Sequence, residues 1–436
     1  MAARRMPGCF WLLLVPAAGL TAVAIGIWIS SAPVHPGRSG IPMTVSIPPA
    51  GDWAAAADRA RRLALAHLTE ENLPGLSVAV GVGDRLVWAE GFGYADTRTR
   101  AHMTPEHRLR IGTASIALTS AAAGLLVEEG RLHPDGEIQS YVPEFPSSRP
   151  PATLRDLMAH TAGLEHGAEN EGVLYTRHCR APAEALPLVA GRPLLFEPGT
   201  AFRFSAYGWI VVSAAVEAAA RRPLLEFMQE RVFQPLGMVQ TAADAGVAEA
   251  DDDFPLFNLF RELVFDPRTR RGFGPAGART APPQQAAAYV PRFIENPRYG
   301  IHLMRPLDLS CYSGASVFVS TPSDLVRFAL GLQSGKLLKP ATVAMLQAPQ
   351  KLASGQPAGY GLGWEAGELI VAGKPVRSAG HEGILLGGDV ADLRIYPENG
   401  VAVAVIANIS HANTRQLAGR IAEEFLREGH GAQGNW

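Results

Sequence analysis

The stretch from Leu109 to Gly130 constrains the fold of this chain most strongly. Gly112 and Thr113 interrupt an extended segment, and the residues after them are almost all apolar or small. A segment that is apolar on most of its faces predicts a buried helix. Gly130, which follows two glutamates, is a typical C-terminal stop. The sequence therefore predicts a central buried helix that starts at a sharp turn around Thr113.

The composition permits a large core and excludes some classes of partner. Of the 436 residues, 47% are apolar and 18% are charged, which suits two domains or one large domain with an insertion. The net charge is −2 and there is no basic block, so no nucleic-acid partner is expected. No cofactor and no metal are expected either. His160, Glu165 and His166 do not have the spacing of a zinc-binding helix.

An apolar run of 20 residues, from Phe10 to Ile29, follows Arg4 and Arg5 near the N-terminus. Twenty helical residues span about 30 Å, enough to cross a bilayer, whereas the core of a signal peptide has about 7–15 residues. Residues 1–32 are therefore expected to form a membrane anchor, with a cleaved signal as the alternative. The arginines are expected to stay inside and the domain to face the extracytoplasmic, periplasmic side.

The pattern of strands and helices predicts one exported domain after a linker. Residues 33–50 are rich in Pro and Gly and predict the linker. Strand patterns lie at both ends of the region 51–430 and helical patterns in its middle. We expect an α/β (α+β) domain whose antiparallel sheet comes from about 51–112 and 316–428, with a helical insertion at about 113–315. Within it, residues 246–306 lack a regular pattern and predict a long loop over a cleft.

Short motifs place individual helices and turns. Thr153 to Asp156 forms a capping box before a short helix, and Thr321 to Asp324 forms a second one with Pro at the first helical position. Asn399-Gly400 predicts a hairpin between two apolar strands. Cys179 and Cys311 can pair in an oxidising compartment, but the sequence leaves that pairing open.

Several segments, in their order and spacing, resemble the class C β-lactamase-like serine hydrolases. This superfamily includes penicillin-binding proteins, D-alanyl-D-alanine carboxypeptidases, esterases and mitochondrial β-lactamase-like proteins. The resemblance covers roughly residues 52–428 and implies a β-lactamase/penicillin-binding-like fold, an antiparallel sheet flanked by helices with a helical insertion. The segments are Gly91–Asp96, Thr153–Leu164, Phe196–Thr200, Pro235–Met238, Ser320–Leu325, Gly359–Trp364 and Gly380–Gly383.

The first two catalytic motifs of that superfamily are replaced in this chain. In the first motif, Ser-x-x-Lys, Thr113 stands at the nucleophile position and Ile116 at the lysine position. Thr113 keeps a hydroxyl, but Ile116 cannot accept a proton. The second motif, Tyr-x-Asn, has become Phe204 and Ala206, which lack the phenol used in proton transfer and the amide that holds substrate.

The third motif survives as His381-Glu382-Gly383, and the resemblance implies that Glu382 and Gly383 face the substrate. Glu382 places a carboxylate where the family often receives a substrate carboxylate. At ~4 Å and an effective dielectric constant near ~20, like charges repel by about 4 kcal/mol, enough to oppose penicillin-like ligands. Two simpler alternatives stay open: a carboxylate on the rim in water for Glu382, and a hydrogen-bonded structural histidine for His381.

These replacements predict a serine hydrolase homologue that has lost its usual mechanism. Loss of a general base costs roughly 10²–10⁴-fold in rate, and groups that act as a unit fail together. We expect a catalytically degenerate, membrane-anchored binding or scaffold protein, with a small-molecule or cell-wall-type ligand in its cleft. The alternative is an active hydrolase of esterase or peptidase type with a rearranged site that uses Thr113.

Overall fold

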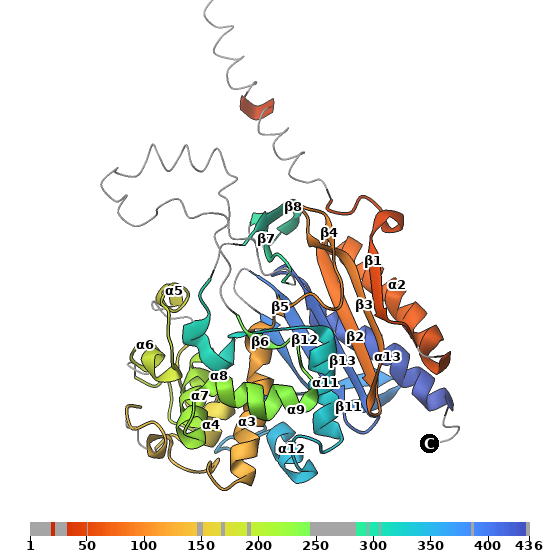
Figure 1. The fold of residues 1–436 in the computed structure, drawn as a ribbon. Helices are drawn as coiled ribbons and strands as arrows, with labels where there is room; N and C mark the ends of the chain where they lie inside the picture. Colours follow the sequence, from red (N-terminus) through yellow and green to blue (C-terminus); the bar gives the residue numbers. More distant parts are fainter. Residues whose placement is uncertain are drawn as a thin grey trace, which may run out of the picture.

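The computed structural model describes residues 19–21, 33–49, 51–145, 151–166, 171–189, 193–244, 285–293, 296–304, 307–384 and 388–432 (Figure 1). The strands are β1 (Met43–Ile47), β2 (Gly75–Val82), β3 (Arg85–Asp96), β4 (Ala101–His102), β5 (Leu109–Arg110), β6 (Ala242–Ala243), β7 (Tyr289–Phe293), β8 (Asn296–Leu303), β9 (Phe318–Ser320), β10 (Glu365–Val371), β11 (Lys374–Ile384), β12 (Val390–Tyr396) and β13 (Val401–Ala407). The α-helices are α2 (Ala54–Glu70), α3 (Ser115–Glu128), α4 (Leu154–Met158), α5 (Glu171–Leu174), α6 (Leu186–Val189), α7 (Ala206–Ala220), α8 (Leu224–Met228), α9 (Gln234–Leu236), α11 (Pro322–Gln333), α12 (Pro340–Gln347) and α13 (Thr414–Ala432). The 3₁₀ turns that matter for the site are η3 (Gly112–Ala114) and η8 (Ser310–Ala315).

The main sheet is antiparallel and joins strands from both ends of the folded region. Its order is β1-β3-β2-β13-β12-β11-β10, with β4 paired to β3. The N-terminal and C-terminal strands meet where β2 pairs with β13, from Val401 opposite Val82 to Ala407 opposite Leu76. Helices α2 and α13 cover one face and α11 covers the other (Figure 1). The predicted antiparallel sheet flanked by helices is thus confirmed.

Both faces of this sheet are buried, and strand β13 shows how its sequence achieves this. Alternate residues of a strand point to opposite faces. Val401, Val403 and Val405 enter the core beneath α2 and α13, whereas Ala402 and Ala404 enter the core beneath α11. A continuous apolar strand therefore fits the centre of a sheet that has helices on both sides, and the small alanines let α11 approach closely.

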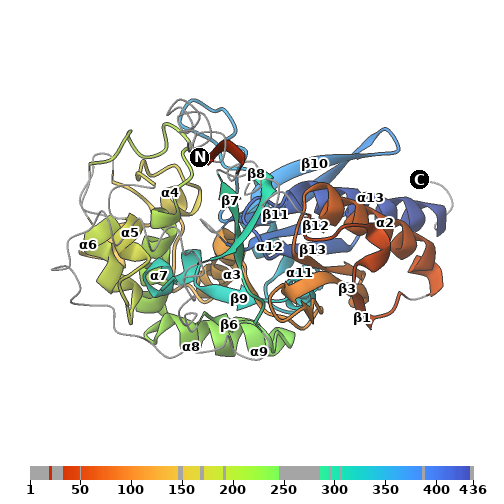
Figure 2. The same cartoon turned by 90° about the horizontal axis from the view of Figure 1, so that it is seen from above.

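The helical region lies beside the sheet and is built on α3 (Figure 2). Helix α3 is buried along most of its length, as its uniformly apolar sequence predicted. It contacts α7 and η8 in the helical region and β11 in the main sheet. Because α3 follows η3 directly, the turn at Thr113 sits between the sheet and the helical region.

The structure differs from the sequence prediction in two irregular segments. Strand β1 lies within residues 33–50, which were predicted as a linker, and it pairs with β3 at the edge of the main sheet. The predicted loop over 246–306 contains the β7–β8 hairpin. Residues 246–284 of that loop lie outside the described part.

Local signals fare better because they depend on near neighbours. Thr153 and Asp156 form the predicted reciprocal capping box at the start of α4. Thr321 caps α11 by accepting from the Asp324 amide. Asn399-Gly400 connects β12 to β13 as predicted, with Gly400 at φ +65°.

Most of the predicted membrane anchor, residues 10–29, lies outside the described residues. Within the part of the chain that the structure describes, no helix is both long and apolar enough to span a bilayer.

Candidate ligand-binding site

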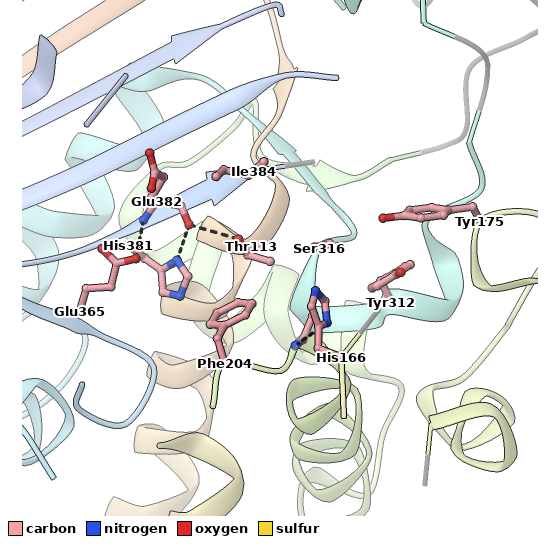
Figure 3. A pocket seen from close by; sticks show the side chains of 11 residues that line it. Thr113, His166, Tyr175, Phe204, Tyr312, Ser316, Glu365, His381, Glu382 and Ile384 are labelled. Atoms are coloured by element: carbon pink, nitrogen blue, oxygen red, sulfur yellow. Dashed lines mark hydrogen bonds between the residues drawn. The ribbon is translucent and has the colours of Figure 1, made fainter. Parts of the chain in front are cut away.

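A pocket of about 320 Å³ opens between the sheet and the helical region (Figure 3). Most of its lining residues carry aromatic rings, hydroxyls or carboxylates. They are Thr113, His166, Tyr175, Phe204, Ala206, Tyr312, Ser316, Glu365, His381, Glu382 and Ile384.

The structure brings together five of the seven residues that the motifs singled out. Thr113, Phe204, Ala206, His381 and Glu382 all line this pocket, although up to 269 positions separate them in the chain (382 − 113). The other two do not line it. Ile116 is fully buried in the core, and Gly383 packs against the backbone of the turn at η3.

We call the side of the pocket formed by η3 and the end of β11 the sheet wall. Here Gly383 allows a very close approach, because a Cβ at this position would lie 1.8 Å from the Ile111 carbonyl oxygen and 2.7 Å from the Ala114 nitrogen. This contact presents Thr113 to the pocket beside β11. The Thr113 hydroxyl donates a hydrogen bond to the carbonyl oxygen of Glu382, at 3.1 Å.

His381 is held at both ring nitrogens. Nδ1 lies 2.6 Å from its neighbour's carbonyl, Glu382 O, so Nδ1 carries the proton because a carbonyl can only accept. Nε2 then accepts from the Tyr360 hydroxyl at 2.7 Å. Burial lowers the pKa of His381 and raises that of Tyr360 well above its usual range. The pair is therefore neutral at physiological pH, and His381 lines the pocket while being fixed structurally.

Two further histidines position the start of α7. The amide of Ser205 donates to His160 Nδ1 at 3.1 Å, and the amide of Ala206 donates to His166 Nδ1 at 3.4 Å. The Phe204 ring packs on His160 with ring centroids 4.4 Å apart. Burial lowers the pKa of His160 well below its usual value, so it is a neutral structural residue. Phe204 thus presents an apolar ring to the pocket where the family motif has a phenol.

Glu382 is neither an unpaired anion nor a carboxylate standing in water, which corrects both sequence interpretations. Its Oε2 lies 2.9 Å from the guanidinium of Arg415 on α13. Burial raises the pKa of Glu382, and Arg415 partly offsets this effect. The repulsion of about 4 kcal/mol expected for an isolated carboxylate is therefore reduced by its cationic partner.

The carboxylate of Glu382 belongs to a mixed charge cluster, which also contains Glu365, Asp392, Arg394 and Arg415. Glu365 Oε2 lies 2.6 Å from both guanidinium groups. Arg394 also binds Asp392, at 2.8 Å. Burial raises the pKa of Glu365, but the charges of Arg394 and Arg415 and the hydrogen bond from Arg394 help to lower this pKa overall, so this carboxylate is ionised at neutral pH.

Tyr175 and Tyr312 form the opposite side of the pocket, which we call the disulfide wall (Figure 3). Their rings lie 5.0 Å apart, centroid to centroid. A disulfide between Cys179 and Cys311, with Cα atoms 4.8 Å apart, joins the two segments that carry these tyrosines. The pairing that the sequence left open is therefore present in the structure.

Sequence reasoning missed several residues of this site. Tyr360 and Glu365 lie in or beside the quoted segment Gly359–Trp364, but nothing local indicates that they face His381. Tyr312 follows Cys311 directly. A pairing of Cys311 with Cys179 was the one sequence signal that could have indicated the disulfide wall. Arg415 gave no signal, because its role depends on where α13 crosses the sheet edge.

The antiparallel sheet with helices on both faces, and a buried helix that begins at a pocket beside the sheet, define a β-lactamase-related or penicillin-binding-like serine hydrolase fold. Residues 60–426 match the family model described as Beta-lactamase. The chain therefore belongs to the Beta-lactamase family, within the β-lactamase-related serine hydrolase superfamily.

Curated relatives agree with this assignment. The mitochondrial serine beta-lactamase-like protein LACTB of Homo sapiens is 25% identical over 489 aligned residues, covering 89% of this chain and 83% of the relative. A D-aminopeptidase of Brucella anthropi is 32% identical over 215 residues, covering 47% of this chain and 38% of that protein.

Solved structures share the fold. The octameric penicillin-binding protein homologue from Pyrococcus abyssi superimposes with a TM-score of 0.67 at 18% identity, covering 85% of this chain and 77% of that one. The D-amino acid amidase from Ochrobactrum anthropi SV3 gives a TM-score of 0.64 at 19% identity, covering 87% and 99%. At these identities the likeness concerns the fold alone.

Proposed function

We propose that this protein is an exported, membrane-anchored pseudoenzyme that binds a ligand in the family's pocket without hydrolysing it. One observation carries the proposal. The Thr113 hydroxyl donates to the peptide carbonyl of Glu382, a group that cannot take its proton. A nucleophilic hydroxyl needs a base within hydrogen-bond reach, so this geometry does not activate it.

The neighbouring groups support the same proposal. Ile116, at the family's lysine position, is apolar and fully buried. Phe204 has no oxygen to relay a proton, and Ala206 has no amide for the substrate. His381 uses both nitrogens in hydrogen bonds with Glu382 and Tyr360. All four side chains that the family uses as nucleophile, base, second acid and substrate amide are therefore replaced in this chain.

A second candidate function is a rearranged hydrolase that uses Thr113. It is favoured by one observation: Thr113 Oγ1 and His381 Nδ1 both bond to the Glu382 carbonyl oxygen, so the hydroxyl and the imidazole share a partner. A ring movement that released Tyr360 or Glu382 would be needed before His381 served as a base.

Two experiments on the full chain in detergent distinguish the pseudoenzyme from the rearranged hydrolase. The first is labelling with a fluorophosphonate and with a fluorescent penicillin, and the second is an assay of neutral ester hydrolysis. We expect labelling and turnover no higher than those of the Thr113→Ala variant. Turnover well above that variant would overturn the pseudoenzyme and favour the rearranged hydrolase.

Restoring the family groups gives a second readout of the same proposal. Single changes among Thr113→Ser, Ile116→Lys, Phe204→Tyr and Ala206→Asn should not give activity, because such groups act as a unit. All four together are expected to give weak turnover of neutral esters. Full activity from Thr113→Ser alone would contradict the proposed loss of the base.

The location of the protein is part of this proposal. The apolar run Phe10–Ile29 supports an anchor, and the Cys179–Cys311 disulfide is typical of an oxidising, exported environment. Fractionation of cells should place the chain in the membrane with its domain open to external protease. A soluble domain with a new N-terminus near Pro33 would show a cleaved signal instead.

A further inference from the structure

Strand β11 separates the charged side chains from the pocket. Adjacent residues of a strand point to opposite faces of the sheet. The His381 ring lies on the pocket side, with its centroid 6.3 Å from that of Phe204. Glu382 therefore points its carboxylate to the other face, where it meets Arg415 of α13, and it reaches the pocket through its backbone (Figure 3).

The other charges of the cluster lie on the same face as the Glu382 carboxylate. Glu365 and Arg394 are both directly opposite Gly380 in the strand ladder. Asp392 is directly opposite Glu382. Directly opposite residues share a face, and so do residues two positions apart on one strand. The carboxylates of this cluster bind guanidiniums there, so they are not available to a ligand in the pocket.

The described side chains that face the pocket are uncharged. Among the lining residues in the described part of the chain, none is Lys or Arg. The His381 imidazole is neutral, because it donates at Nδ1 and accepts at Nε2. His166 accepts from the Ala206 amide at Nδ1, so this nitrogen carries no proton and the ring is neutral as well. An ionised ligand would lose water here without gaining a partner of opposite charge, which is costly.

The Thr113 hydroxyl is set to accept a hydrogen bond from a ligand. Its single proton is donated to the carbonyl oxygen of Glu382, which also accepts from His381 Nδ1. A hydroxyl has one donor and two lone pairs, so Thr113 Oγ1 keeps acceptor capacity and has no proton left to give. A ligand group at this position therefore has to donate. A hydroxyl or an N–H group does so, whereas an ether or ester oxygen does not.

We infer that the pocket binds an uncharged molecule that carries a hydroxyl or a primary amide on an aromatic body. The O–H or N–H of the ligand donates to Thr113 Oγ1. The body packs against Phe204 and against the paired rings of Tyr175 and Tyr312. A volume of about 320 Å³ suits a ligand built around one ring. This inference rests on the proposed binding function and specifies the ligand class of that same site.

Four ligands with the same ring test the inference: phenethyl alcohol, its methyl ether, phenethylamine and phenylacetate. Each is titrated calorimetrically into the full chain in detergent, with empty micelles as the blank. We expect the alcohol to bind about 5-fold more tightly than the ether, which cannot donate, and at least about 10-fold more tightly than either ion. Equal or tighter binding of the ether or of an ion, or heat from the alcohol no greater than that of the blank, would overturn the inference.

Thr113→Val tests the hydrogen bond while keeping the shape of the side chain. Alcohol binding should fall about 5-fold to the level of the ether, and ether binding should stay the same, which an unfolded protein cannot show. Thr113→Ser keeps the hydroxyl and should keep the preference. Thr69→Val is the matched control, because the Thr69 hydroxyl in α2 also donates to a backbone carbonyl, that of Leu65, at 2.9 Å. A preference for the alcohol that survives Thr113→Val would contradict the proposed bond.

Phe204→Leu tests the position of the aromatic body. It removes a ring that packs on the ligand, so alcohol and ether binding should weaken by the same factor, about 3–10-fold, with their ratio unchanged. Unchanged affinity for both ligands would place the body outside this pocket and overturn the inference.

These outcomes are separate from those of the hydrolase assay. Preferential alcohol binding together with ester turnover would overturn the pseudoenzyme proposal and keep the ligand class. No preferential alcohol binding together with no turnover would overturn the ligand class and keep the pseudoenzyme proposal.

Discussion

The two walls of the pocket are held in place by different means. The sheet wall rests on a continuous antiparallel ladder, in which β11 pairs with both β10 and β12. The disulfide wall rests on the four-residue helix α5, the turn η8 and the Cys179–Cys311 bond. Short segments bury little apolar surface and are weakly stabilised by packing alone. The disulfide therefore stabilises this wall, as the hydrogen-bonded strand ladder stabilises the sheet wall.

The walls also differ in how they set the charge of the aspartate that lies behind each of them. Behind the sheet wall, Asp389 is fully buried and accepts a hydrogen bond from the Arg110 amide at 2.8 Å. Behind the disulfide wall, Asp308 is partly exposed and accepts from the Ser310 amide and from His178, both at 2.9 Å. The sheet wall therefore keeps the Asp389 carboxyl away from water, whereas the Asp308 carboxyl behind the disulfide wall is partly in contact with water.

The largest expected effect comes from the closest contact in the sheet wall. Gly383→Ala places a Cβ 1.8 Å from the Ile111 carbonyl oxygen, so the turn and the strand must separate. We expect a loss of about 4 kcal/mol or more in the free energy of unfolding, measured by denaturant titration. Gly419→Ala in α13 is the control, because its nearest neighbour is 3.9 Å away. It should stabilise the protein by about 0.5–1 kcal/mol. A Gly383→Ala variant as stable as the wild type would show that the turn does not depend on this contact.

The next effect tests the disulfide wall. The double change Cys179→Ser and Cys311→Ser removes a link between residues 132 positions apart. We expect a loss of about 2–4 kcal/mol in the free energy of unfolding and a separation of the Tyr175–Tyr312 pair, seen as a changed near-ultraviolet circular dichroism spectrum. Cys9→Ser, which leaves this disulfide intact, is the control. An unchanged spectrum and stability would mean that local hydrogen bonds alone hold this wall.

The smallest effects concern pH and have opposite signs on the two walls. Burial raises the pKa of Asp389 to about 7 from 3.8, so the native state binds more protons than the unfolded state between these values. The contribution of Asp389 to stability therefore falls as the pH rises from about 4 to 7. Asp389→Asn should flatten that fall and gain on the order of 1 kcal/mol relative to the wild type at pH 8, measured by denaturant titration across this range.

Asp308 provides the matched comparison. Burial raises the pKa of Asp308, but hydrogen bonds from Ser310 and His178 outweigh this effect and lower the pKa overall. Its folded pKa is below its unfolded value, so its stabilisation is present above about pH 4 and is lost as the pH falls through the folded pKa. Asp308→Asn should cost less than about 1 kcal/mol at pH 7 and show no difference from wild type in strong acid. The same pH trend for both variants would remove the contrast between the walls.

Sequence alone determined the elements whose signals are local. The apolar stretch after Gly112 fixed α3, because a helix without a polar face has to be buried. Thr153 with Asp156, and Asn399 with Gly400, fixed a helix start and a hairpin through interactions that span only a few residues. The ordered motifs also fixed the family, and they placed Thr113, Phe204 and His381 at corresponding positions of one site.

Only the tertiary structure decided what those site residues contact. Strand β1 looked like a linker because its pairing partner, β3, is more than 40 positions away. Glu382 looked like an isolated anion because Arg415 reaches it from a helix at the other end of the chain. The same holds for the Tyr360–His381 bond and for the Cys179–Cys311 pair. Contacts between residues that are distant in the sequence depend on how the whole chain packs. No local sequence pattern specifies which distant residue will become the partner.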